Sequence, residues 1–561
     1  MNGPALTPTA QTVFVRFMIR MHSGAAVAMF VVLAACGGGS ETVTPVTPLP
    51  PVVQPPVLGQ TYVSSGRAAA GDVFVHLFEW KWNDIARECE VWLGPRGYKG
   101  VQISPPSEHA IVRNSGAFFP WWQRYQTVSY KLDQSRSGTA AELQNMVQRC
   151  KAVGVDIYAD VVINHMTAGS GTGSAGSVYT KYNYPTVPYS QLDFHTACSI
   201  DSYAVQQQVQ GCELVGLSDL ATESDAVRGR IAAYLIALND IGIAGFRVDA
   251  AKHVPAADLE AILTRVNNAA TAAGRAKPFV FLEIIAGSGD AVTPQQYYGV
   301  GYASGGATDI TDFTYGNRIS DAFYGRGGFT LLGALNAFTS ELLPSDKSVV
   351  FIDNHDTQRG SALYYADSTY ELAAVMMLGH GQGYASLMSG YGVDRSGQLS
   401  RDAGPPSDGN GNTIGSFNQD GSSKCTVTFG SVQAAQWICE HRRPAIANMV
   451  AFRHAAAGTP TTTCGRSSFT INTDPNRVAF CRDGAGFVAI SNSATDGTDV
   501  LPTRLPAGTY CNVAQFNFTP AAGSTPAACS GAPIVVSADG SASITLTRRS
   551  AVALHTRAKL N

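Results

Sequence analysis

The stretch DAVRGRIAAYLIALNDIGIAGFRVDAAKH, residues 225–253, contains the alternation that decides the fold. Its first part, Asp225–Ile241, has apolar residues at the spacing of an amphipathic helix, and Ala244–Asp249 is a short apolar run typical of a buried strand. The same alternation recurs from residue 72 onward. The candidate strands are Asp72–Phe78, Gly100–Ser104, Asp156–Ile163, Ala244–Asp249, Phe279–Ile285, Thr308–Phe313, Ser348–Asp353 and Tyr384–Met388. The other candidate helices are Ala140–Val153, Ala256–Ala273 and Tyr370–Leu378.

Strands separated by helices predict parallel pairing, because a crossover is needed to bring the next strand back beside the first. Eight such strands with polar residues at their ends predict an α/β protein with a (β/α)₈ TIM barrel. A doubly wound sheet is the alternative, but no Gly-rich phosphate loop follows the first strand.

Two segments interrupt the alternation. Residues 166–220 open with a Gly/Ser-rich loop and lack a long helical stretch, which predicts a small subdomain inserted after the third strand. From residue 456 to 561, short alternating runs are separated by Gly, Pro and Asp turns, which predicts a C-terminal antiparallel β-sandwich domain. The catalytic barrel is therefore expected over 69–165 and 221–455.

The N-terminus has the features of an export signal. Arg16 and Arg20 precede the apolar run Gly24–Ala35, which is shorter than the ~20 residues a membrane-spanning helix needs. The residues LAAC at 33–36 resemble the lipobox of bacterial lipoproteins, in which Cys36 would be lipidated after removal of a signal peptide over 1–35. The alternative is an ordinary cleaved signal with a chance cysteine. Residues 36–68 are rich in Pro, Gly and Thr and predict an extended tether.

Composition agrees with an exported globular protein. The chain has 561 residues, which suggests two or three domains, and a net charge of −3. No basic field is available to bind nucleic acid, and contact with a membrane is expected only through a lipid at Cys36. We expect a monomer that is extracellular or held at the cell surface as an outer-membrane lipoprotein, with a neutral polar substrate.

Cysteine usage points the same way. Eleven cysteines are present, and setting Cys36 aside leaves an even number, which predicts disulfides in an exported protein. The sequence leaves the connectivity open. We favour the pairing of neighbours, namely Cys89 with Cys150, Cys198 with Cys212, Cys425 with Cys439, Cys464 with Cys481, and Cys511 with Cys529. No CxxC spacing occurs among them, so a structural zinc site is not predicted.

Four polar segments close predicted strands. They are DVVINH at 160–165, GFRVDAAKH at 245–253, FLEI at 281–284 and FIDNHD at 351–356. In this order they resemble the signature regions of the α-amylase family of glycoside hydrolases. Three further segments resemble the animal-type branch of that family, namely GVQISPP at 100–106, PWWQRYQ at 120–126 and CEHR at 439–442. The resemblance extends from about residue 71 to the end.

The resemblance implies endo-hydrolysis of α-1,4 bonds in starch, glycogen and maltooligosaccharides, with Asp249, Glu283 and Asp356 as catalytic residues. Glycoside hydrolysis needs one carboxyl group as acid and a second as nucleophile, about 5–5.5 Å apart in retaining enzymes. Arg247 lies two residues before Asp249 on a strand, so both side chains point to one face. We therefore expect Asp249 to have a low pKa and act as nucleophile, and Glu283 to have a raised pKa and act as acid.

Substrate contacts follow from the same segments. Aromatic faces stack on sugar rings, so Trp121, Trp122 and Tyr125 are expected to form a sugar platform, the alternative being ordinary core aromatics. His165 and His355 would hold sugar hydroxyls beside Asp356. The resemblance further implies substrate contacts by Gln126, Arg247, Lys252 and His253.

The resemblance also implies two ions. Calcium would be held by the side chains of Asn164 and Asp219 and the carbonyls of Gln210 and His253, all oxygen donors as a hard cation requires. Chloride in this branch lies between two basic residues and an asparagine. Arg247 and Asn354 match two of these positions, but Ser386 replaces the second basic residue. We therefore predict little or no activation by chloride. The Gly-rich loop expected soon after Asp356 is also missing.

Other interpretations remain open at this point. Any single strand-end carboxylate could be a helix cap, and Arg247 with Asp249 could be a structural ion pair. An exo-acting, α-glucosidase-like or transglycosylating member of the same family would share the three carboxyl groups. A non-catalytic glucan-binding lipoprotein would bind the same polymer without needing Glu283.

Overall fold

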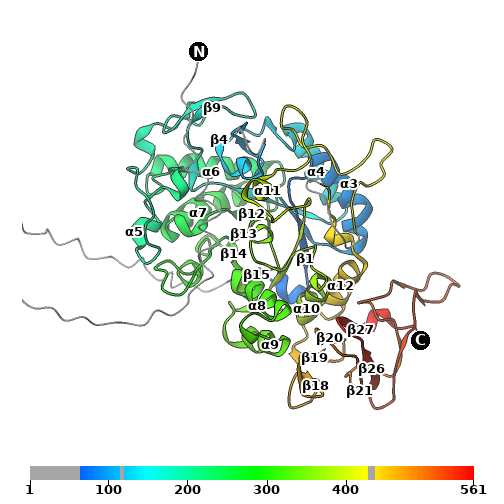
Figure 1. Ribbon diagram of the computed structural model, residues 1–561. Helices are drawn as coiled ribbons and strands as arrows, with labels where there is room; N and C mark the ends of the chain where they lie inside the picture. The colour runs from blue at the N-terminus through cyan, green and yellow to red at the C-terminus, as the bar shows by residue number, and fades with distance from the viewer. Residues whose placement is uncertain (1–62, 114–118, 428–435, 561) are drawn as a thin grey trace, which may run out of the picture.

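The computed structural model describes residues 63–113, 119–427 and 436–560. Eight parallel strands form a closed barrel in the order β1-β16-β15-β14-β13-β12-β7-β2 (Figure 1). Their bounds are β1 Val73–Leu77, β2 Gly100–Ile103, β7 Asp156–Val161, β12 Gly245–Val248, β13 Phe279–Leu282, β14 Ala307–Asp312, β15 Ser348–Val350 and β16 Tyr384–Ser389. All eight predicted strands are confirmed. A doubly wound sheet is excluded because β1 pairs with both β2 and β16 and leaves no edge.

Helices surround the barrel (Figure 1). They are α3 Trp82–Glu88, α4 Ala140–Ala152, α6 Asp225–Asp240, α7 Ala256–Ala272, α8 Phe313–Tyr324, α9 Leu331–Ser340, α10 Tyr370–His380 and α12 Pro444–Ala455. The four predicted helices are confirmed to within two residues at each end. At the start of α4, Thr139 and Glu142 form a capping box that satisfies two backbone donors.

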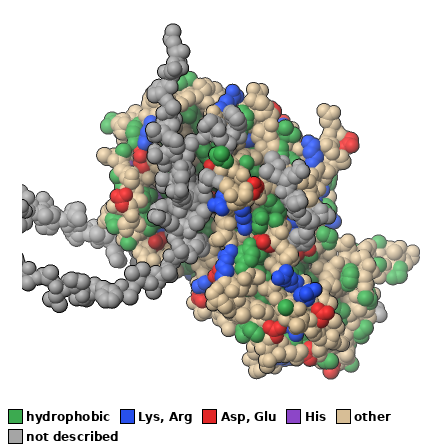
Figure 2. Space-filling model, viewed as in Figure 1, with side chains coloured by type: hydrophobic (Ala, Val, Ile, Leu, Met, Phe, Trp, Pro, Cys, Tyr) green, Lys and Arg blue, Asp and Glu red, His purple; other side chains and the backbone are tan. Residues whose placement is uncertain are grey.

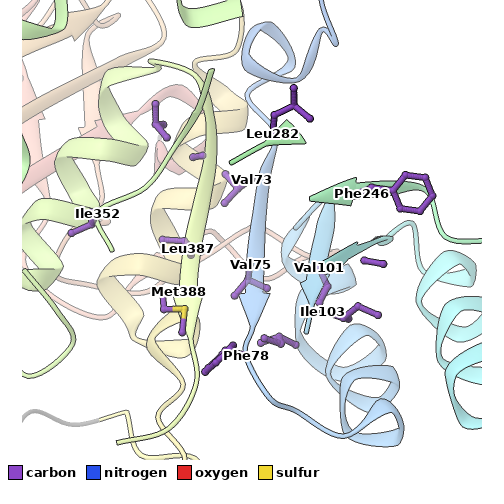
Figure 3. Close-up of a cluster of buried hydrophobic side chains, with 14 of the residues drawn as sticks. Val73, Val75, Phe78, Val101, Ile103, Phe246, Leu282, Ile352, Leu387 and Met388 are labelled. Carbon is purple, nitrogen blue, oxygen red and sulfur yellow. The ribbon is translucent and has the colours of Figure 1, made fainter. Parts of the chain in front are cut away.

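Successive residues of the barrel strands face opposite sides, and both sides are apolar. Phe74, Tyr158, Phe281 and Tyr384 fill the barrel interior, with the rings of Phe74 and Tyr384 4.7 Å apart. Tyr158 fits there because residue 100 is glycine, since a Cβ at that position would lie 2.5 Å from the tyrosine ring. The outward residues form the larger core against the helices, and Figure 3 shows Val73, Val75, Val101, Ile103, Phe246, Leu282 and Leu387 in that cluster.

The segment between β7 and α6 forms the inserted subdomain. Its ends are joined by β8 (His165–Met166), which pairs antiparallel with β11 (Ser218–Asp219). Between them lie the two-stranded sheet of β9 (Ser170–Thr172) and β10 (Val178–Thr180) and the short helix α5 (Gln206–Val209). The short strands β3 Glu108–His109, β4 Thr127–Ser129, β5 Gln134–Ser135 and β6 Gly138–Thr139 follow β2.

The C-terminal region is built from antiparallel strands. One sheet contains β17 Thr461–Thr462, β18 Thr470–Ile471, β19 Asp474–Arg482, β20 Gly486–Ser491 and β27 Ser550–His555. The second layer holds the pairs β21 Gly497–Pro502 with β26 Ser541–Leu546, β22 Gly508–Tyr510 with β25 Ile534–Val536, and β23 Phe518–Thr519 with β24 Ala528–Cys529. Phe487, Leu554, Leu501 and Ile544 pack together in the core of this region, as expected for a sandwich. Its first sheet contacts α10 and α12 of the barrel (Figure 1).

All five predicted disulfides are confirmed: Cys89–Cys150, Cys198–Cys212, Cys425–Cys439, Cys464–Cys481 and Cys511–Cys529. Basic and acidic side chains are interspersed on the face seen in Figure 2.

The N-terminal predictions fall mostly beyond the described residues. The signal peptide, Cys36 and most of the tether lie in residues 1–62. Inside the predicted tether, Arg67–Ala70 forms the short helix α2, and Arg67 makes ion pairs with Asp72 at 3.1 Å and Asp156 at 3.2 Å. In the part of the chain that the structure describes, no helix has the length and apolar character needed to cross a membrane.

Candidate active site

A cleft with a cavity volume of about 120 Å³ opens at the carboxyl ends of the barrel strands. Asp249, Glu283 and Asp356 all line it. They come from the loops after β12, β13 and β15, and the parallel barrel brings the ends of these strands to one rim. The three carboxyl groups predicted to be catalytic therefore share one cavity.

Arg247 contacts three carboxyl groups, two of which line this cleft. Its Nη1 donates to both oxygens of Asp160, at 2.7 and 2.8 Å, and to Oδ1 of Asp249 at 2.9 Å. Its Nη2 lies 2.6 Å from Oε1 of Glu283. Asp160 also accepts a hydrogen bond of 3.0 Å from the Tyr125 hydroxyl. A single guanidinium is thus shared by Asp160, Asp249 and Glu283.

The expectation of a low pKa for Asp249 is wrong. Burial raises the pKa of Asp249, and Arg247 offsets that increase only in part. The physical reason is burial, since Asp249 is only 8% exposed and its carboxylate loses the water that would stabilise its charge. Asp160 makes the two-oxygen contact with Nη1 of Arg247. Burial likewise raises the pKa of Asp160 to about 7.

Glu283 follows β13, and the residue is 7% exposed. The Ala250 backbone N–H donates to its Oε2 at 2.8 Å. Ala250 adopts a left-handed conformation with φ 48°, which ends β12 sharply and turns its N–H toward Glu283. Burial and the nearby charge of Asp249 raise the pKa of Glu283, while Arg247 lowers it. The predicted direction of this pKa is confirmed.

Asp356 follows β15 in the segment that also contributes Asn354 and His355. The amide oxygen of Asn354 accepts hydrogen bonds from the backbone N–H groups of Asp356, at 3.0 Å, and Thr357, at 2.8 Å. Burial, followed by the charge of Glu283, raises the pKa of Asp356 to about 8. The Nε2 atom of His355 lies 3.2 Å from Oδ2 of Asp356, and burial keeps the pKa of this imidazole well below its ordinary value.

Aromatic rings form one wall of the cleft. The 3-10 helix η3 (Trp121–Tyr125) places Trp121 and Tyr125 in the lining, and the Trp121 Nε1–H donates to the Arg401 carbonyl at 3.1 Å. His355 packs between the rings of Tyr125 and Phe78, each centroid 5.0 Å away. Trp121 and Tyr125 thus lie where a sugar platform was expected.

The other predicted substrate contacts are distributed unevenly. Trp122 is half-buried against the hydrophobic core and is not in the cavity lining. Gln126 accepts a hydrogen bond of 2.8 Å from the Thr167 hydroxyl and is also outside the lining. His165 lines the cavity, with Nε2 3.0 Å from the Tyr125 carbonyl oxygen. His253 lines it as well.

Lys252 lines the opposite side of the cavity and is bound there by its neighbours. Its ammonium donates to Oδ2 of Asp290 at 2.6 Å and to the Ile285 carbonyl at 2.7 Å. It also lies 4.4 Å from the centroid of the Tyr203 ring. Asp290, Ile285 and Tyr203 were not predicted from the sequence.

The residues expected to bind calcium lie in two pairs at the junction of subdomain and barrel. Asp219 of β11 is paired with His165 of β8, the neighbour of Asn164. The His253 ring lies 2.7 Å from the carbonyl oxygen of Val209, the neighbour of Gln210. His165 and His253 line the same cavity, so the two pairs lie near each other.

The chemistry of these residues fits a hard cation. Asn164 and Asp219 are each 2% exposed, and the side-chain amide oxygen, the carboxylate and two main-chain carbonyls are all oxygen donors. The Asp219 carboxylate also contacts a side chain of the same chain, since its Oδ2 lies 2.7 Å from Nδ1 of His195. In the ranges 63–113, 119–427 and 436–560, no three His, Cys, Asp or Glu side chains gather as a metal cluster. A site here would thus depend on the amide and carbonyl oxygens.

The residues expected to bind chloride line a second, smaller cavity of about 20 Å³. Arg247, Asn354 and Ser386 all border it, together with His76. Burial and the charges of Arg247 and Arg359 keep the pKa of His76 well below its ordinary value, so this histidine is neutral. Arg247 is therefore the only cation among the residues lining this cavity.

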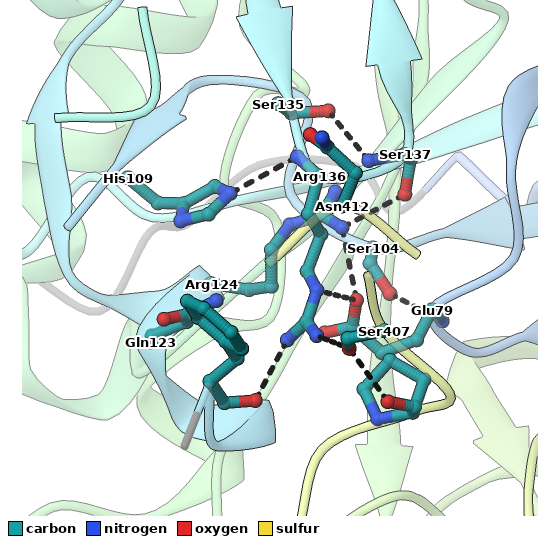
Figure 4. Close-up of polar contacts among 12 residues, drawn as sticks. Glu79, Ser104, His109, Gln123, Arg124, Ser135, Arg136, Ser137, Ser407 and Asn412 are labelled. Atoms are coloured by element: carbon teal, nitrogen blue, oxygen red, sulfur yellow. Dashed lines mark hydrogen bonds and ion pairs between the residues drawn. The ribbon is translucent and has the colours of Figure 1, made fainter. Parts of the chain in front are cut away.

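Behind the aromatic wall lies a buried cluster of charges (Figure 4). Glu79 is fully buried, with Arg124 at 3.0 Å and Arg136 at 3.7 Å from its Oε2. Arg124 also donates to the Pro105 carbonyl at 3.2 Å, and Arg136 donates to the Ser407 hydroxyl at 2.6 Å. The cluster ties the loops after β1, β2 and β16 together beneath η3.

Sequence reasoning left four contributors to the site unassigned: Asp160, Tyr203, Asp290 and Arg359. Asp160 opens the segment DVVINH and could have been found by position, because it lies on β7 opposite Arg247 of β12. Asp290 and Tyr203 lie on loops, where no regular spacing of residues in the sequence marks them as part of the site. Arg359 follows Asp356 by three residues, which places it after the strand end rather than on it.

Known proteins resemble nearly the whole chain. A family model described as the α-amylase catalytic domain matches residues 105–276. The α-amylase of Tribolium castaneum is 44% identical over 88% of this chain and 96% of that protein. The α-amylase of Thermomonospora curvata is 43% identical over 87% of this chain and 74% of that protein. Pancreatic α-amylase 2a5 of Mus musculus is 38% identical over 89% and 96%.

Solved structures give the same result. Wild-type α-amylase I from Eisenia fetida superposes with a TM-score of 0.75 at 36% identity, covering 88% of this chain and 99% of that one. A mutant of that enzyme in complex with maltohexaose superposes with the same TM-score of 0.75 at 35% identity.

Proposed function

The chain belongs to the α-amylase family of glycoside hydrolases, and we propose that it is an endo-acting α-amylase that cuts α-1,4-glucosidic bonds with retention of anomeric configuration. The substrates are starch, glycogen and soluble maltooligosaccharides. A maltohexaose complex of a similar enzyme supports an α-glucan substrate.

One observation carries the proposal. Asp249, Glu283 and Asp356 line a single cavity, and Arg247 contacts the first two of them directly. Helix caps or a structural ion pair would not require three carboxyl groups from three different strand ends to face one open cleft. Glycosidic cleavage does require closely placed carboxyl groups with different proton affinities.

Glu283 is the proton donor in this proposal. Its carboxyl is buried beside Asp249, which favours the protonated form, and the Ala250 N–H holds Oε2 in place. A carboxylic acid that remains protonated near neutral pH can pass its proton to the glycosidic oxygen as the bond breaks.

Asp249 is the nucleophile. The hydrogen bond of 2.9 Å from Arg247 orients its Oδ1 and favours its ionised form against the effect of burial. Its attack on the sugar carbon would give a covalent glycosyl-enzyme, and Glu283, now deprotonated, would activate the water that releases it. Asp356 and His355 would bind ring hydroxyls of the distorted sugar, since Asn354 and the stacked Tyr125 hold them rigidly.

The direct test is Glu283→Gln, which keeps the shape of the side chain but removes its acidic proton. Hydrolysis of soluble starch should fall by about 10²- to 10⁴-fold, while binding of maltooligosaccharides survives. Glu341→Gln on the exposed end of α9 is the matched control and should retain wild-type activity. A Glu283→Gln enzyme with undiminished hydrolysis would refute the proposal and leave the glucan-binding lipoprotein as the better interpretation.

A time course of products separates endo action from the exo-acting and transglycosylating alternatives. An endo enzyme releases a broad range of oligosaccharides early, whereas an exo enzyme releases one short product from the start. NMR of the first product tests retention, because a retaining enzyme forms the α-anomer first.

Two ions and a location complete the proposal. Calcium would be held by Asn164, Asp219 and the carbonyls of Gln210 and His253, and would join the subdomain to the barrel. Chloride would have little effect, because Ser386 contributes no positive charge to its cavity. The five disulfides support secretion, and we propose attachment to the cell surface through a lipid on Cys36.

A further inference from the structure

Arg359 is a buried cation enclosed by aromatic rings. It ends the 3-10 helix η10 (Thr357–Arg359) and is 3% exposed. The central carbon of its guanidinium lies 4.7 Å from the ring centroid of Trp121, 5.3 Å from that of Phe78 and 5.5 Å from that of Tyr391. Ring faces attract a desolvated cation, so this cage can hold the charge without a carboxylate.

Each nitrogen of this guanidinium donates to a different part of the cleft wall. Nη1 donates to the His355 carbonyl, Nη2 to the Tyr391 hydroxyl at 2.8 Å, and Nε to the Arg401 carbonyl at 3.1 Å. The Arg401 carbonyl also accepts the indole N–H of Trp121 at 3.1 Å. The planar fork of one arginine therefore fixes the positions of His355 and Trp121 together.

The contact with His355 bears directly on Asp356. Arg359 holds the carbonyl of the peptide that links His355 to Asp356, while Phe78 and Tyr125 hold the two faces of the imidazole. Rotation of that peptide would displace the Asp356 carboxyl and its neighbour Nε2 of His355, which are 3.2 Å apart. A small displacement of a group that binds the reacting sugar costs more in rate than in binding.

We propose that Arg359 is a positioning residue of the reaction, which acts through His355, Trp121 and Asp356 without touching the substrate. The inference rests on the proposed glycosidase function and adds to it the residue that keeps the sugar-binding wall in its reactive geometry.

A matched control lies nearby. Arg395 donates to the carbonyls of Gln358, at 2.7 Å, and Ala362, at 2.8 Å, and its guanidinium lies 3.4 Å from the Tyr364 ring centroid. It therefore anchors the same loop by the same kinds of contact as Arg359. These contacts involve neither His355 nor Trp121, so the loss of Arg395 should affect stability but leave the wall in place.

The test compares Arg359→Met, Arg359→Lys and Arg395→Met by kcat and KM on maltoheptaose and by thermal unfolding. Arg359→Met should lower kcat by about 10²-fold with KM changed by less than about threefold. Lysine keeps the charge but can replace only one of the three directed contacts, so Arg359→Lys should recover about tenfold of the lost kcat. Arg395→Met should keep kcat within about threefold while its melting temperature falls.

Should Arg359→Met fail to fold, Tyr391→Phe gives the answer, because it removes the hydroxyl that accepts from Nη2 of Arg359 and donates to the Ala403 carbonyl, and it should lower kcat about three- to tenfold. The proposal is overturned if Arg359→Met keeps the wild-type kcat, or if Arg395→Met loses as much kcat as Arg359→Met does. If Arg359→Met does not fold, a Tyr391→Phe enzyme with the wild-type kcat overturns it. Glu283→Gln is measured in the same assay, because it alone tests the proton donor. Its result therefore distinguishes failure of the Arg359 proposal from failure of the proposed glycosidase function.

Discussion

The imidazole ring of His355 stacks on the phenol ring of Tyr125 with centroids 5.0 Å apart and planes 1° from parallel. The same tyrosine donates its hydroxyl to Asp160, the main partner of Arg247. Tyr125 thus connects the aromatic wall of the cleft to the charges around Arg247.

Substitutions at Tyr125 should separate these two roles. Tyr125→Phe keeps the stack but removes the hydrogen bond to Asp160, so it should cost about 1.5 kcal/mol of unfolding free energy and change kcat/KM less than about fivefold. Tyr125→Leu removes the stack and should lower kcat/KM about 10- to 100-fold. Steady-state kinetics and thermal unfolding measure both. Equal kinetic losses in the two variants would contradict a role for the stack.

Asp160→Asn should shift the pH dependence of the reaction. Loss of this negative charge leaves more of the positive field of Arg247 for Glu283, and a stronger positive field lowers the pKa of Glu283. Because the reaction needs protonated Glu283, the alkaline limb of the kcat/KM profile should move to lower pH by about one unit. Asp312→Asn, which removes a buried carboxylate that caps α8 and does not line the cleft, should leave the limb in place. An unmoved or raised limb in Asp160→Asn would contradict the sharing of Arg247.

Removal of calcium should destabilise the enzyme. If the ion is present at about 100 times its dissociation constant, binding contributes about 2.7 kcal/mol, which a chelator would remove. Asp219→Asn should lower the melting temperature without chelator and show a smaller further drop with it. Asp201→Asn, at an exposed position of the same subdomain, should respond to chelator like the wild type. A wild-type melting temperature that chelator leaves unchanged would exclude this site.

Chloride should change activity less than about twofold when titrated at constant ionic strength with gluconate, because one guanidinium with neutral donors binds an anion weakly. Ser386→Arg supplies a second cation to the cavity that Arg247 and Asn354 already line. That variant should become dependent on chloride, whereas Ser386→Ala should not. Several-fold stimulation of the wild type would refute the prediction.

Glu79→Gln should be strongly destabilising. It leaves Arg124 and Arg136 buried without a counter-charge, which costs about 3–5 kcal/mol. The matched variant Glu90→Gln breaks an ion pair with Arg149 whose partners are 39% and 34% exposed, and should cost about 0–1 kcal/mol. Thermal unfolding compares the two. Similar losses would show that Glu79 is not needed to neutralise the two arginines.

The barrel was predictable because its strands are short apolar runs between helices. Runs such as Val73–Leu77 and Phe279–Leu282 that alternate with helices are typical of the parallel strands of a barrel. The catalytic carboxyl groups were predictable for a related reason. Asp249 and Glu283 each come directly after a strand, so knowledge of the strand ends places them at one rim.

The charge balance of the site was not predictable in the same way. Arg247 and Asp249 are two residues apart in sequence, but the two-oxygen contact of Arg247 is with Asp160 on the neighbouring strand. The raised pKa of Asp249 comes from its burial. Sequence spacing gives neither the contact nor the burial.

Local backbone turns account for the remaining differences. Trp121 and Trp122 are neighbours on the 3-10 helix η3, but only Trp121 lines the cavity, while Trp122 is half-buried against the hydrophobic core. Arg359 was overlooked because its function depends on three rings, Phe78, Trp121 and Tyr391, from three separate loops.

The order of the five disulfides has a consequence for how this protein can be made. The ten cysteines from Cys89 to Cys529 are bonded in consecutive pairs along the chain, so no bridge encloses or crosses another. A chain that leaves the translocation pore from its N-terminus exposes each pair before the following pair appears. Oxidation in order of emergence therefore produces the native bonds directly, and the need for a disulfide isomerase during export is small.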